Sequence, residues 1–329
     1  MNFLGQDIHP LGMGCWPIAG PMFSGEQSLG YTNADDATSI RTIHAALDAG
    51  ITLFDTAAAY GAGHSERLLS QALKTRPDAM ITTKIGIAID EITKQLTFGD
   101  THPDRVLPAI DHCLNRLDRD RIDLVLLHDN ALPVAQADAL FDQMERAIQL
   151  GKIRAYGWST DFSASLKATA TRPGFQAVQH SMNVFYDVPR IQNVVQTQEL
   201  TAMIRSPLAM GLLSGTYRPD TKLRAGDVRS GANSGTEYFK DAGPNPAFLK
   251  ALDDIRDLLT LDGRSLVQGA LGWLWAKGQH NIPIPGARTE EQITGIAKAL
   301  EFGALPHSAM QEIERLIPRP KNMAPEQEL

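Results

Sequence analysis

The stretch ITLFDTAAAYGAGHSERLLSQALKTRPDAMITTKI, residues 51–85, carries the main fold signal of this chain. Its first part, Ile51–Thr56, is an apolar run that predicts a buried strand. The segment Ser65–Lys74 then predicts a helix, and Ala79–Ile85 predicts a second strand. Apolar strands that alternate with helices are typical of a parallel sheet covered on its faces.

The same alternation continues on both sides of this stretch. Further strands are expected at Leu11–Trp16, Ile122–His128, Ile153–Ser159, Ala177–Asn183, Leu200–Arg205 and Asn281–Pro285. Further helices are expected at Asp35–Ala49, Pro103–Leu117, Ala135–Leu150, Pro246–Leu261, Leu266–Lys277 and Thr289–Leu300. With about eight strands the pattern predicts an α/β fold of the (β/α)8 or TIM type, a parallel barrel.

A doubly wound open sheet is the alternative fold. Its nucleotide-binding form needs G-x-G-x-x-G between the first strand and the first helix. Gly12 and Gly14 supply the first two glycines, but Pro17 stands at the third position. The pair Gly61 and Gly63 fails in the same way, so the barrel is favoured.

The 329 residues would allow two domains by length alone. Single barrels, however, commonly run to about 250 residues and beyond. The weakest stretch, Pro219–Pro246, is rich in Gly, Asp, Asn and Ser, and strand and helix patterns continue after it. We therefore expect one domain over residues 1–329, with a long loop near residues 219–246 and a frayed tail at about 318–329. A loop of this length is often a lid over a site, and a plain surface insertion is the alternative.

Composition excludes several classes of function. The net charge of −7 disfavours a general binder of nucleic acid, which needs an excess of Lys and Arg. No apolar segment approaches the length of a membrane span, and the first ten residues do not resemble a signal peptide. The two cysteines, Cys15 and Cys113, form no metal-binding motif and are expected to be reduced and buried. A cytoplasmic protein without a metal site is the expectation.

Polar side chains stand at the ends of consecutive predicted strands: Asp55 with nearby Tyr60, then Lys84, then His128. Barrel enzymes carry their active sites at this edge. A phenol is a weak acid at neutral pH, and a neighbouring ammonium lowers its pKa. Lys84 can play that part while Asp55 holds it, and His128 can orient a carbonyl oxygen. Such a site protonates an oxygen as hydride arrives at carbon.

Each of these residues also has an ordinary structural explanation. Asp55 can cap a turn, Lys84 can point into solvent, His128 can be a hydrogen-bonded core residue and Tyr60 can pack in a turn. Four such groups at successive strand ends are harder to explain in this way, and the functional interpretation is preferred.

The chain resembles the aldo-keto reductases. The resemblance covers residues 8 to 316, in the expected order. The motifs that carry it are FDTAAAYGAGHSERLL (54–69), ITTK (81–84), DLVLLH (123–128), GWST (157–160), VQHSMN (178–183), SPLAMGLLSG (206–215) and IPGARTEEQI (284–293). It implies a (β/α)8 barrel in which Asp55, Tyr60, Lys84 and His128 form the catalytic tetrad, with NADPH extended across the barrel mouth.

The resemblance also implies a set of cofactor contacts. Ser159, Thr160 and Gln179 would hold the carboxamide, Pro207–Ser214 the pyrophosphate and Gly286–Gln292 the 2′-phosphate. The residues assigned to the cofactor are Ser159, Thr160, Gln179, Arg205, Ser206, Pro207, Leu208, Gly211, Leu213, Ser214, Gly286, Arg288, Thr289 and Gln292. The planar fork of Arg288 suits a phosphate and favours NADP(H) over NAD(H).

Three positions depart from the family pattern. Arg205 stands where an aromatic residue often stacks on the nicotinamide, and its guanidinium can lie on a ring, bind an acidic substrate or the pyrophosphate, or pair with a carboxylate. Thr160 stands where Asn is commoner. Gly295 and Ile296 replace a Glu-Asn pair, which predicts weaker contacts to the adenine.

Loops after the strands would line the substrate pocket. The candidates are Trp16, Phe23, Tyr31, Ala58 and Asn130, with Met182 and Phe185 as weaker ones. The aromatic residues suit a hydrophobic aldehyde or a sugar face. Asp129 and Asn130 make the mouth more polar, which favours a polyol, a sugar or another polar carbonyl compound.

The sequence thus predicts an NADPH-dependent oxidoreductase that reduces an aldehyde or ketone, with Tyr60 as proton donor. Oxidation of a sugar or polyol by the reverse reaction is the first alternative. A regulatory NADPH-binding subunit with low turnover, like the channel β-subunits of the family, is the second. The expected partner is a small carbonyl substrate, with no nucleic acid or membrane, and the protein is expected to be a monomer or a small homo-oligomer.

Overall fold

The computed structural model describes residues 1–31, 33–99, 101–224, 227–230, 237–317, 319–320 and 322–325. Within these residues the main sheet has eight strands, and all neighbours are parallel. They are β3 (Gly12–Gly14), β6 (Leu53–Asp55), β7 (Met80–Ile85), β10 (Ile122–Leu127), β11 (Ile153–Ser159), β12 (Phe175–Ser181), β13 (Thr201–Arg205) and β16 (Asn281–Pro283). Their order in the sheet is the order of the chain.

The two edge strands of this sheet meet and close it into a barrel. The backbone N–H of Gly14 donates to the carbonyl of Pro285 at 3.0 Å, and Gly14 forms a parallel bridge with Gly286. A Cβ on Gly14 would lie 2.6 Å from the carbonyl oxygen of Ile284, so only glycine fits this seam. The predicted barrel is confirmed, and the open sheet is wrong.

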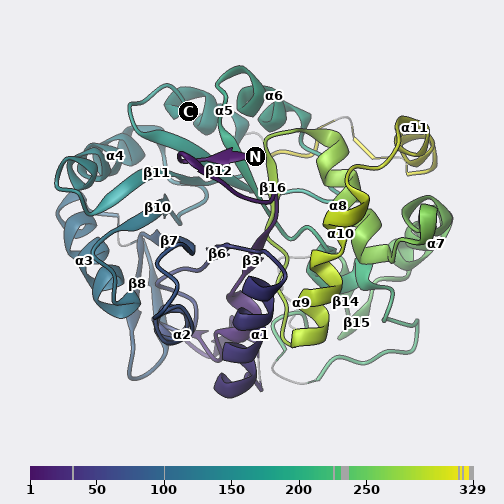
Figure 1. The fold of residues 1–329 in the computed structure, drawn as a ribbon, viewed down its shortest axis with the longest axis horizontal. Helices are drawn as coiled ribbons and strands as arrows, with labels where there is room; N and C mark the ends of the chain where they lie inside the picture. The colour runs from purple at the N-terminus through teal and green to yellow at the C-terminus, as the bar shows by residue number, and fades with distance from the viewer. Residues whose placement is uncertain are drawn as a thin grey trace.

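Helices surround the barrel on its outside (Figure 1). They are α1 (Asp36–Asp48), α2 (His64–Ala72), α3 (Val106–Leu117), α4 (Val134–Gln149), α5 (Ser163–Thr169), α6 (Pro189–Thr197), α7 (Pro246–Leu259), α8 (Leu266–Lys277), α9 (Glu290–Ala297), α10 (Ala299–Phe302) and α11 (His307–Leu316). Every predicted helix is present, although the single helix expected at Thr289–Leu300 is divided into α9 and α10. The sequence analysis did not predict α5, α6 or α11.

Apolar side chains form an inner and an outer core. The inner cluster fills the barrel and includes Leu53, Leu124, Met203 and Ile282. The outer cluster lies between the strands and the helices. Alternation of side chains along each strand supplies both clusters.

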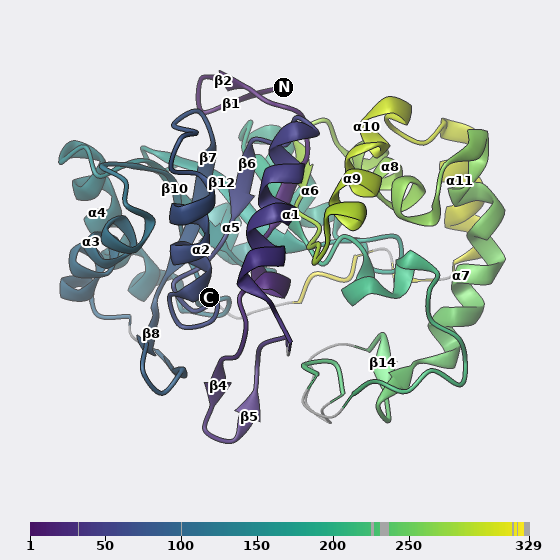
Figure 2. The same cartoon turned by 60° about the horizontal axis from the view of Figure 1, so that its bottom comes forward.

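A short hairpin, β1 (Asn2–Phe3) and β2 (Gln6–Asp7), covers the amino-terminal end of the barrel. Its neighbours Phe3 and Ile8 belong to the inner cluster. Figure 2 shows this hairpin at the opposite end of the molecule from the hairpin β4–β5 (Phe23–Ser24 and Gln27–Ser28). The carboxyl ends of the strands are therefore left for a site.

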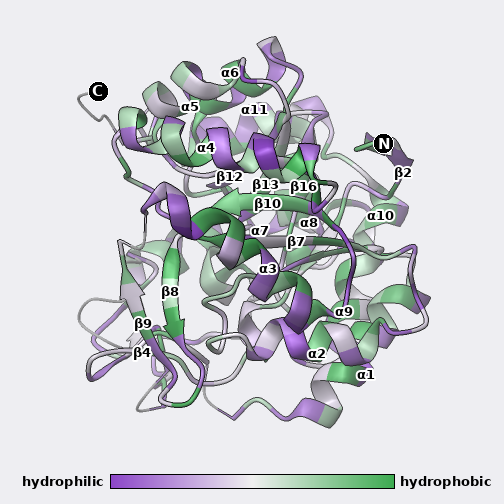
Figure 3. Cartoon of the chain, turned by 90° about the vertical axis from the view of Figure 1, so that its left-hand side faces the viewer, coloured by the Kyte–Doolittle hydropathy of each residue, from purple (hydrophilic) through white to green (hydrophobic). Residues whose placement is uncertain are grey.

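A second small sheet stands beyond the carboxyl end of the barrel. It joins β4 and β5 to a hairpin of β8 (Ile87–Asp90) and β9 (Gln95–Phe98), in the order β5-β4-β9-β8. Figure 3 shows β8 as a hydrophobic strand outside the barrel. Neither hairpin was predicted, because both are short and lie within segments that resemble loops.

The structure describes parts of the two segments that were expected to be irregular. The predicted loop at residues 219–246 contains a hairpin, β14 (Phe239–Lys240) with β15 (Gly243–Pro244), while its residues 225–226 and 231–236 lie outside the described residues. In the predicted frayed tail, Arg319 donates to the carbonyl of Val184 at 2.8 Å and the N–H of Met323 to the carbonyl of Asp187 at 2.9 Å. Residues 319–320 and 322–325 are thus attached to the loop after β12, and positions 318, 321 and 326–329 lie outside the described residues.

Candidate active site

Parallel strands bring the four predicted catalytic residues to one edge of the barrel. Asp55 ends β6, Lys84 is the second-last residue of β7, and His128 directly follows β10. Tyr60 lies in the turn after β6, where its N–H donates to the carbonyl of Ala57 at 3.0 Å. Gly61 comes next with φ 61°, and a Cβ there would lie 2.0 Å from the carbonyl oxygen of Ala19. Only glycine allows this turn, which aims Tyr60 at the barrel mouth.

Lys84 is the centre of the hydrogen-bond network. Its Nζ lies 2.8 Å from Asp55 Oδ2, 2.9 Å from Asp55 Oδ1 and 2.8 Å from the carbonyl oxygen of Thr56. The same Nζ donates to the hydroxyl of Tyr60 at 3.2 Å. The side chain of Lys84 is 0% exposed, so a solvent-facing lysine is excluded.

The pKa of each group follows from burial and from this ion pair. Burial alone would lower the pKa of Lys84, but the Asp55 carboxylate outweighs it, so the pKa is raised and the ammonium stays charged. For Tyr60, burial raises the pKa of the phenol and the charge of Lys84 offsets only part of that rise. Lys84 thus lowers the pKa of Tyr60, as expected, but burial has the larger effect, and the phenol keeps its proton over the neutral range.

His128 stands beside Tyr60, with ring centroids 5.9 Å apart in an edge-to-face arrangement. Burial, reinforced by the charges of Lys84 and Arg205, lowers the pKa of His128 well below its usual value. The imidazole is thus neutral and carries one N–H and one bare nitrogen. Its buried Nδ1 has no hydrogen-bond partner among the described residues.

A cavity of about 1100 Å³ opens above these groups. It reaches from Tyr60 and His128 to the amino-terminal end of α9. The predicted residues that line it are Trp16, Tyr31, Asp55, Tyr60, His128, Asn130, Ser159, Gln179, Arg205, Ser206, Pro207, Leu208, Gly211, Ser214, Gly286, Arg288 and Gln292. Most of the predicted site residues therefore lie on one continuous surface.

Four predicted residues do not line this cavity. Lys84 lies beneath its floor, and Leu213 is buried in the outer core. Thr160 is buried, and its hydroxyl donates to the carbonyl of Asn130 at 2.7 Å. Thr289 caps α9 by accepting from the N–H of Gln292 at 3.2 Å. The substrate candidates Phe23 and Ala58, and the weaker ones Met182 and Phe185, lie outside the lining as well.

Asp161 is a residue of this region that the sequence analysis missed. Its carboxylate forms an ion pair with Arg205 and accepts from the N–H of Ser181 at 2.8 Å. Asn130 is fixed to it from both sides, because its Oδ1 accepts from the N–H of Asp161 at 2.7 Å and its Nδ2 donates to Asp161 Oδ2 at 3.3 Å. The sequence feature that could have identified Asp161 is its position as an acidic residue just after the predicted strand Ile153–Ser159.

Arg229, in the long segment after Pro219, is a second missed residue. It forms an ion pair with Asp227 and donates to the carbonyl of Met210 at 3.1 Å. Its guanidinium also lies over the rings of Tyr31 and Tyr217, each 5.6 Å from the centroid. Arg229 lines the cavity, so residues 227–230 of this segment are attached to the cavity wall.

The two unpredicted hairpins supply an apolar wall to the cavity. It consists of Met22, Leu29, Ile87, Leu96 and Phe98, next to Trp16. Phe98 is 57% exposed, which is unusual for so large an apolar side chain.

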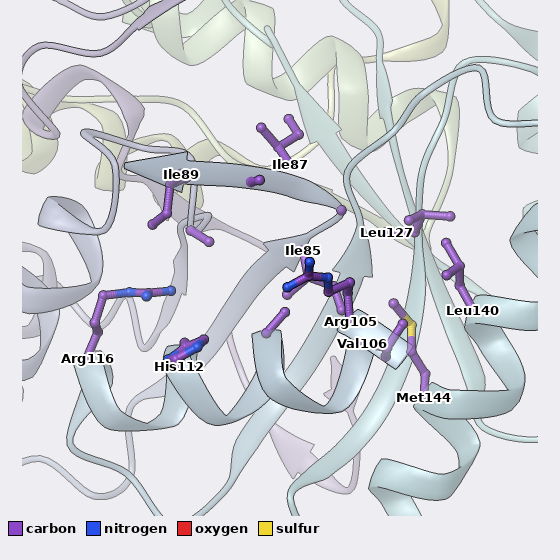
Figure 4. A pocket seen from close by; sticks show the side chains of 14 residues that line it. Ile85, Ile87, Ile89, Arg105, Val106, His112, Arg116, Leu127, Leu140 and Met144 are labelled. Carbon is purple, nitrogen blue, oxygen red and sulfur yellow. The ribbon is translucent and has the colours of Figure 1, made fainter. Parts of the chain in front are cut away.

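Ile87 also lines a second cavity of about 230 Å³ on the other side of β8 (Figure 4). Figure 4 shows Ile85 of β7 and Ile89 of β8 on the side of α3, which carries His112 and Arg116, while Ile87 points to the opposite face of β8. The polar catalytic candidates lie outside this lining, so this cavity is separate from the large one.

Within the described ranges no three His, Cys, Asp or Glu side chains gather in a way that could hold a metal ion. The described helices include none long and apolar enough to cross a membrane. Cys15 and Cys113 are free and buried, as expected.

Comparison with known proteins assigns the family. Residues 10–318 match the family model described as the aldo/keto reductase family. The aldo-keto reductase YhdN of Bacillus subtilis is 28% identical over 305 residues, which cover 89% of this chain and 86% of that protein. An Escherichia coli protein named NADH-specific methylglyoxal reductase is 24% identical, over 89% of this chain and 90% of its own. The glycerol dehydrogenase AKR11B4 from Gluconobacter oxydans superposes with a TM-score of 0.79 at 29% identity, over 96% of this chain and 94% of its own. The chain therefore belongs to the aldo/keto reductase family, and it is an oxidoreductase that reduces carbonyl groups with a nicotinamide cofactor.

Proposed function

We propose that this protein uses NADPH to reduce an aldehyde or ketone that carries an apolar group, with Tyr60 as the proton donor. The observation that carries the proposal is the hydrogen bond from Lys84 to Tyr60, in a chain where Lys84 is itself held by Asp55. This arrangement presents a protonated phenol to the cavity and stabilises the charge it acquires when the proton leaves.

His128 has a separate role in this proposal. Because its imidazole is neutral, it donates a hydrogen bond without adding a positive charge to the site. It would orient the carbonyl oxygen toward the hydroxyl of Tyr60, which would deliver the proton.

The cavity fits an extended dinucleotide. When bound, a nicotinamide cofactor supplies the hydride for the carbonyl carbon. Gln179 and Ser159 lie beside the reacting groups and would hold the carboxamide. Gln179 also donates to Asp55 at 2.8 Å, so its amide is already oriented. Arg229 would meet the pyrophosphate, since it presents a cation beside Gly211 and Ser214.

Preference for NADPH over NADH rests on the far end of the cavity. Arg288 lines it there, and its guanidinium donates to the carbonyl of Asn33 at 2.8 Å. Lys298, at the C-terminal end of α9, lines the same cavity, as does the carboxylate of Glu291, so Arg288 is the cation on which the preference depends. A relative named as NADH-specific shows that the family alone does not decide the cofactor.

The apolar wall of Met22, Leu29, Ile87, Leu96 and Phe98 supports a substrate with an apolar group. The polar mouth that favoured a sugar or polyol is the weaker argument, because both polar atoms of the Asn130 side chain are already hydrogen-bonded to Asp161. The reverse reaction, oxidation of a polyol, is the second candidate, and the likeness to a glycerol dehydrogenase is the observation that favours it.

Steady-state assays would test this proposal. We would measure NADPH and NADH oxidation with benzaldehyde, a short aliphatic aldehyde, a dicarbonyl and an aldose, and glycerol oxidation at high pH. The proposal predicts the highest kcat/KM for benzaldehyde with NADPH. A higher kcat/KM for the aldose or for glycerol would contradict the proposed substrate class, and equal use of NADH would contradict the cofactor preference.

A further inference from the structure

We propose that Arg205 biases this site toward the reduced form of the nicotinamide cofactor, by placing a positive charge beside the ring that becomes a cation when hydride leaves. The inference rests on the proposed function and adds a residue that makes the site bind NADPH in preference to NADP+. Arg205 stands where the family often has a neutral aromatic residue, so the property belongs to this chain.

The positive end of the Arg205–Asp161 pair faces the cavity. Arg205 is the last residue of β13, and its Nη2 bonds to Asp161 Oδ2. The side chain of Arg205 is 33% exposed, against 11% for Asp161. Arg205 lines the cavity and Asp161 does not. A group bound in the cavity therefore lies closer to the guanidinium of Arg205 than to the carboxylate of Asp161.

The pair is held in place by its surroundings. Asp161 accepts from the N–H of Ser181 at 2.8 Å, and it exchanges two hydrogen bonds with Asn130. Ser181 ends β12 and pairs in register with Arg205 on β13. Asp161, which anchors the guanidinium, is thus attached to β12, and Arg205 itself belongs to β13. The positive charge of Arg205 therefore stays at the cavity wall.

The charge of Arg205 acts on the reacting groups themselves. Burial has the largest influence on the pKa of both Tyr60 and His128, and Arg205 acts on both as a positive charge that disfavours protonation. Hydride and proton go to adjacent atoms of one carbonyl group, so the nicotinamide ring has to lie next to Tyr60. A cation that acts on Tyr60 also acts on that ring.

Transfer of hydride, which carries two electrons, to the carbonyl carbon leaves the ring with one positive charge, while the carbonyl oxygen takes the proton from Tyr60. Arg205 repels the charged ring and not the neutral one. It therefore weakens binding of NADP+ more than binding of NADPH. Asp161 offsets part of this effect, so we expect a difference of about tenfold between the two dissociation constants.

Equilibrium binding would test this inference without turnover. NADPH and NADP+ would each be titrated into the full-length protein, with quenching of tryptophan fluorescence as the signal, since Trp16 lines the cavity. We expect Arg205→Met to lower the ratio Kd(NADP+)/Kd(NADPH) by about tenfold, and Arg205→Lys to keep it near the wild-type value. Asp161→Asn removes the offsetting charge and should raise the ratio. Thermal melting of each variant would confirm that it is folded.

The opposite signs for Arg205→Met and Asp161→Asn make the test specific. Ratios that stay within about twofold of wild type in both variants would overturn the inference while leaving the proposed function intact. If the wild-type protein bound neither nucleotide, the proposed function would fail and the inference with it.

Discussion

At the scale of single residues, one buried ammonium organises the candidate site. Lys84 bonds to Asp55 and donates to Tyr60, so a change at any of the three affects the others. The sequence analysis predicted these residues because each stands at a strand end with a chemically specific side chain. It did not predict the direction of the Tyr60 pKa, because the balance between burial and the charge of Lys84 depends on the three-dimensional surroundings.

The pH dependence follows from the pKa directions. Tyr60 must carry its proton to act as an acid, so activity is lost as pH rises through its pKa. Burial raises that pKa above the usual value of about 10. His128 is already neutral, since its pKa is lowered well below the usual range. We therefore expect kcat/KM for carbonyl reduction to stay level from about pH 6.5 to 9 and to fall only above that.

A pH–rate profile with a fixed, saturating NADPH concentration would check this prediction. A change in kcat/KM between pH 6 and 8 would contradict it, because a group other than Tyr60, with an ordinary histidine pKa, would then control the reaction.

Arg288 is the residue on which cofactor choice should depend. We expect Arg288→Gln to raise the KM for NADPH by about tenfold and to leave the KM for NADH almost unchanged, because only NADPH carries the 2′-phosphate. Lys167→Gln, on α5 and away from the cavity, is the matched control. Equal increases in the KM for NADPH and the KM for NADH would show that Arg288 has a structural role and does not recognise the 2′-phosphate.

At the scale of elements, buried ion pairs attach the helices to the strand that carries Lys84. Glu66 of α2 accepts from Thr83 of β7 and from Arg116 of α3, each at 2.6 Å. Arg116 also reaches Glu91, in the turn of the β8–β9 hairpin, at 3.2 Å. The two carboxylates bind the same guanidinium but differ in burial, since Glu66 is 0% exposed and Glu91 36%.

This difference predicts unequal losses of stability. Glu66→Ala leaves Arg116 buried beside an empty space, and we expect the free energy of unfolding to fall by about 3–5 kcal/mol. Glu91→Ala removes a half-exposed partner and should cost about 0–1 kcal/mol. Urea unfolding monitored by circular dichroism would measure both, and comparable losses would contradict the importance of burial at this site.

Arg229 attaches the segment after Pro219 to the cavity wall. Its guanidinium pairs with Asp227 of the same segment and contacts Tyr31, Tyr217 and the carbonyl of Met210. We expect Arg229→Ala to speed the release of NADPH by about tenfold, because the segment loses its attachment. Stopped-flow fluorescence would measure the release rate, with the exposed Arg218→Ala, just before this segment, as the control. An unchanged rate in Arg229→Ala would show that this segment does not retain the cofactor.

At the scale of the whole molecule, the barrel was predictable and its loops were not. Long apolar strands such as Ile122–His128 and Ala79–Ile85 are recognised by period and composition. The hairpins β4–β5 and β8–β9 contain strands of two and four residues, too short for such a signal. They form the apolar wall of the large cavity, so the substrate surface was the part of the site least visible in the sequence. Single-domain organisation, oligomeric state and cytoplasmic location stay predictions.

The central claim is that Tyr60 donates the proton in an NADPH-dependent carbonyl reduction. The most direct test is kcat for benzaldehyde reduction by Tyr60→Phe, with the Kd for NADPH measured in parallel and Tyr31→Phe, a second phenol of the same cavity, as the control. The account predicts that Tyr60→Phe loses about a hundred- to ten-thousand-fold in kcat and binds NADPH as wild type does, while Tyr31→Phe keeps most of its turnover. A Tyr60→Phe protein that reduces the aldehyde at the wild-type rate would contradict it.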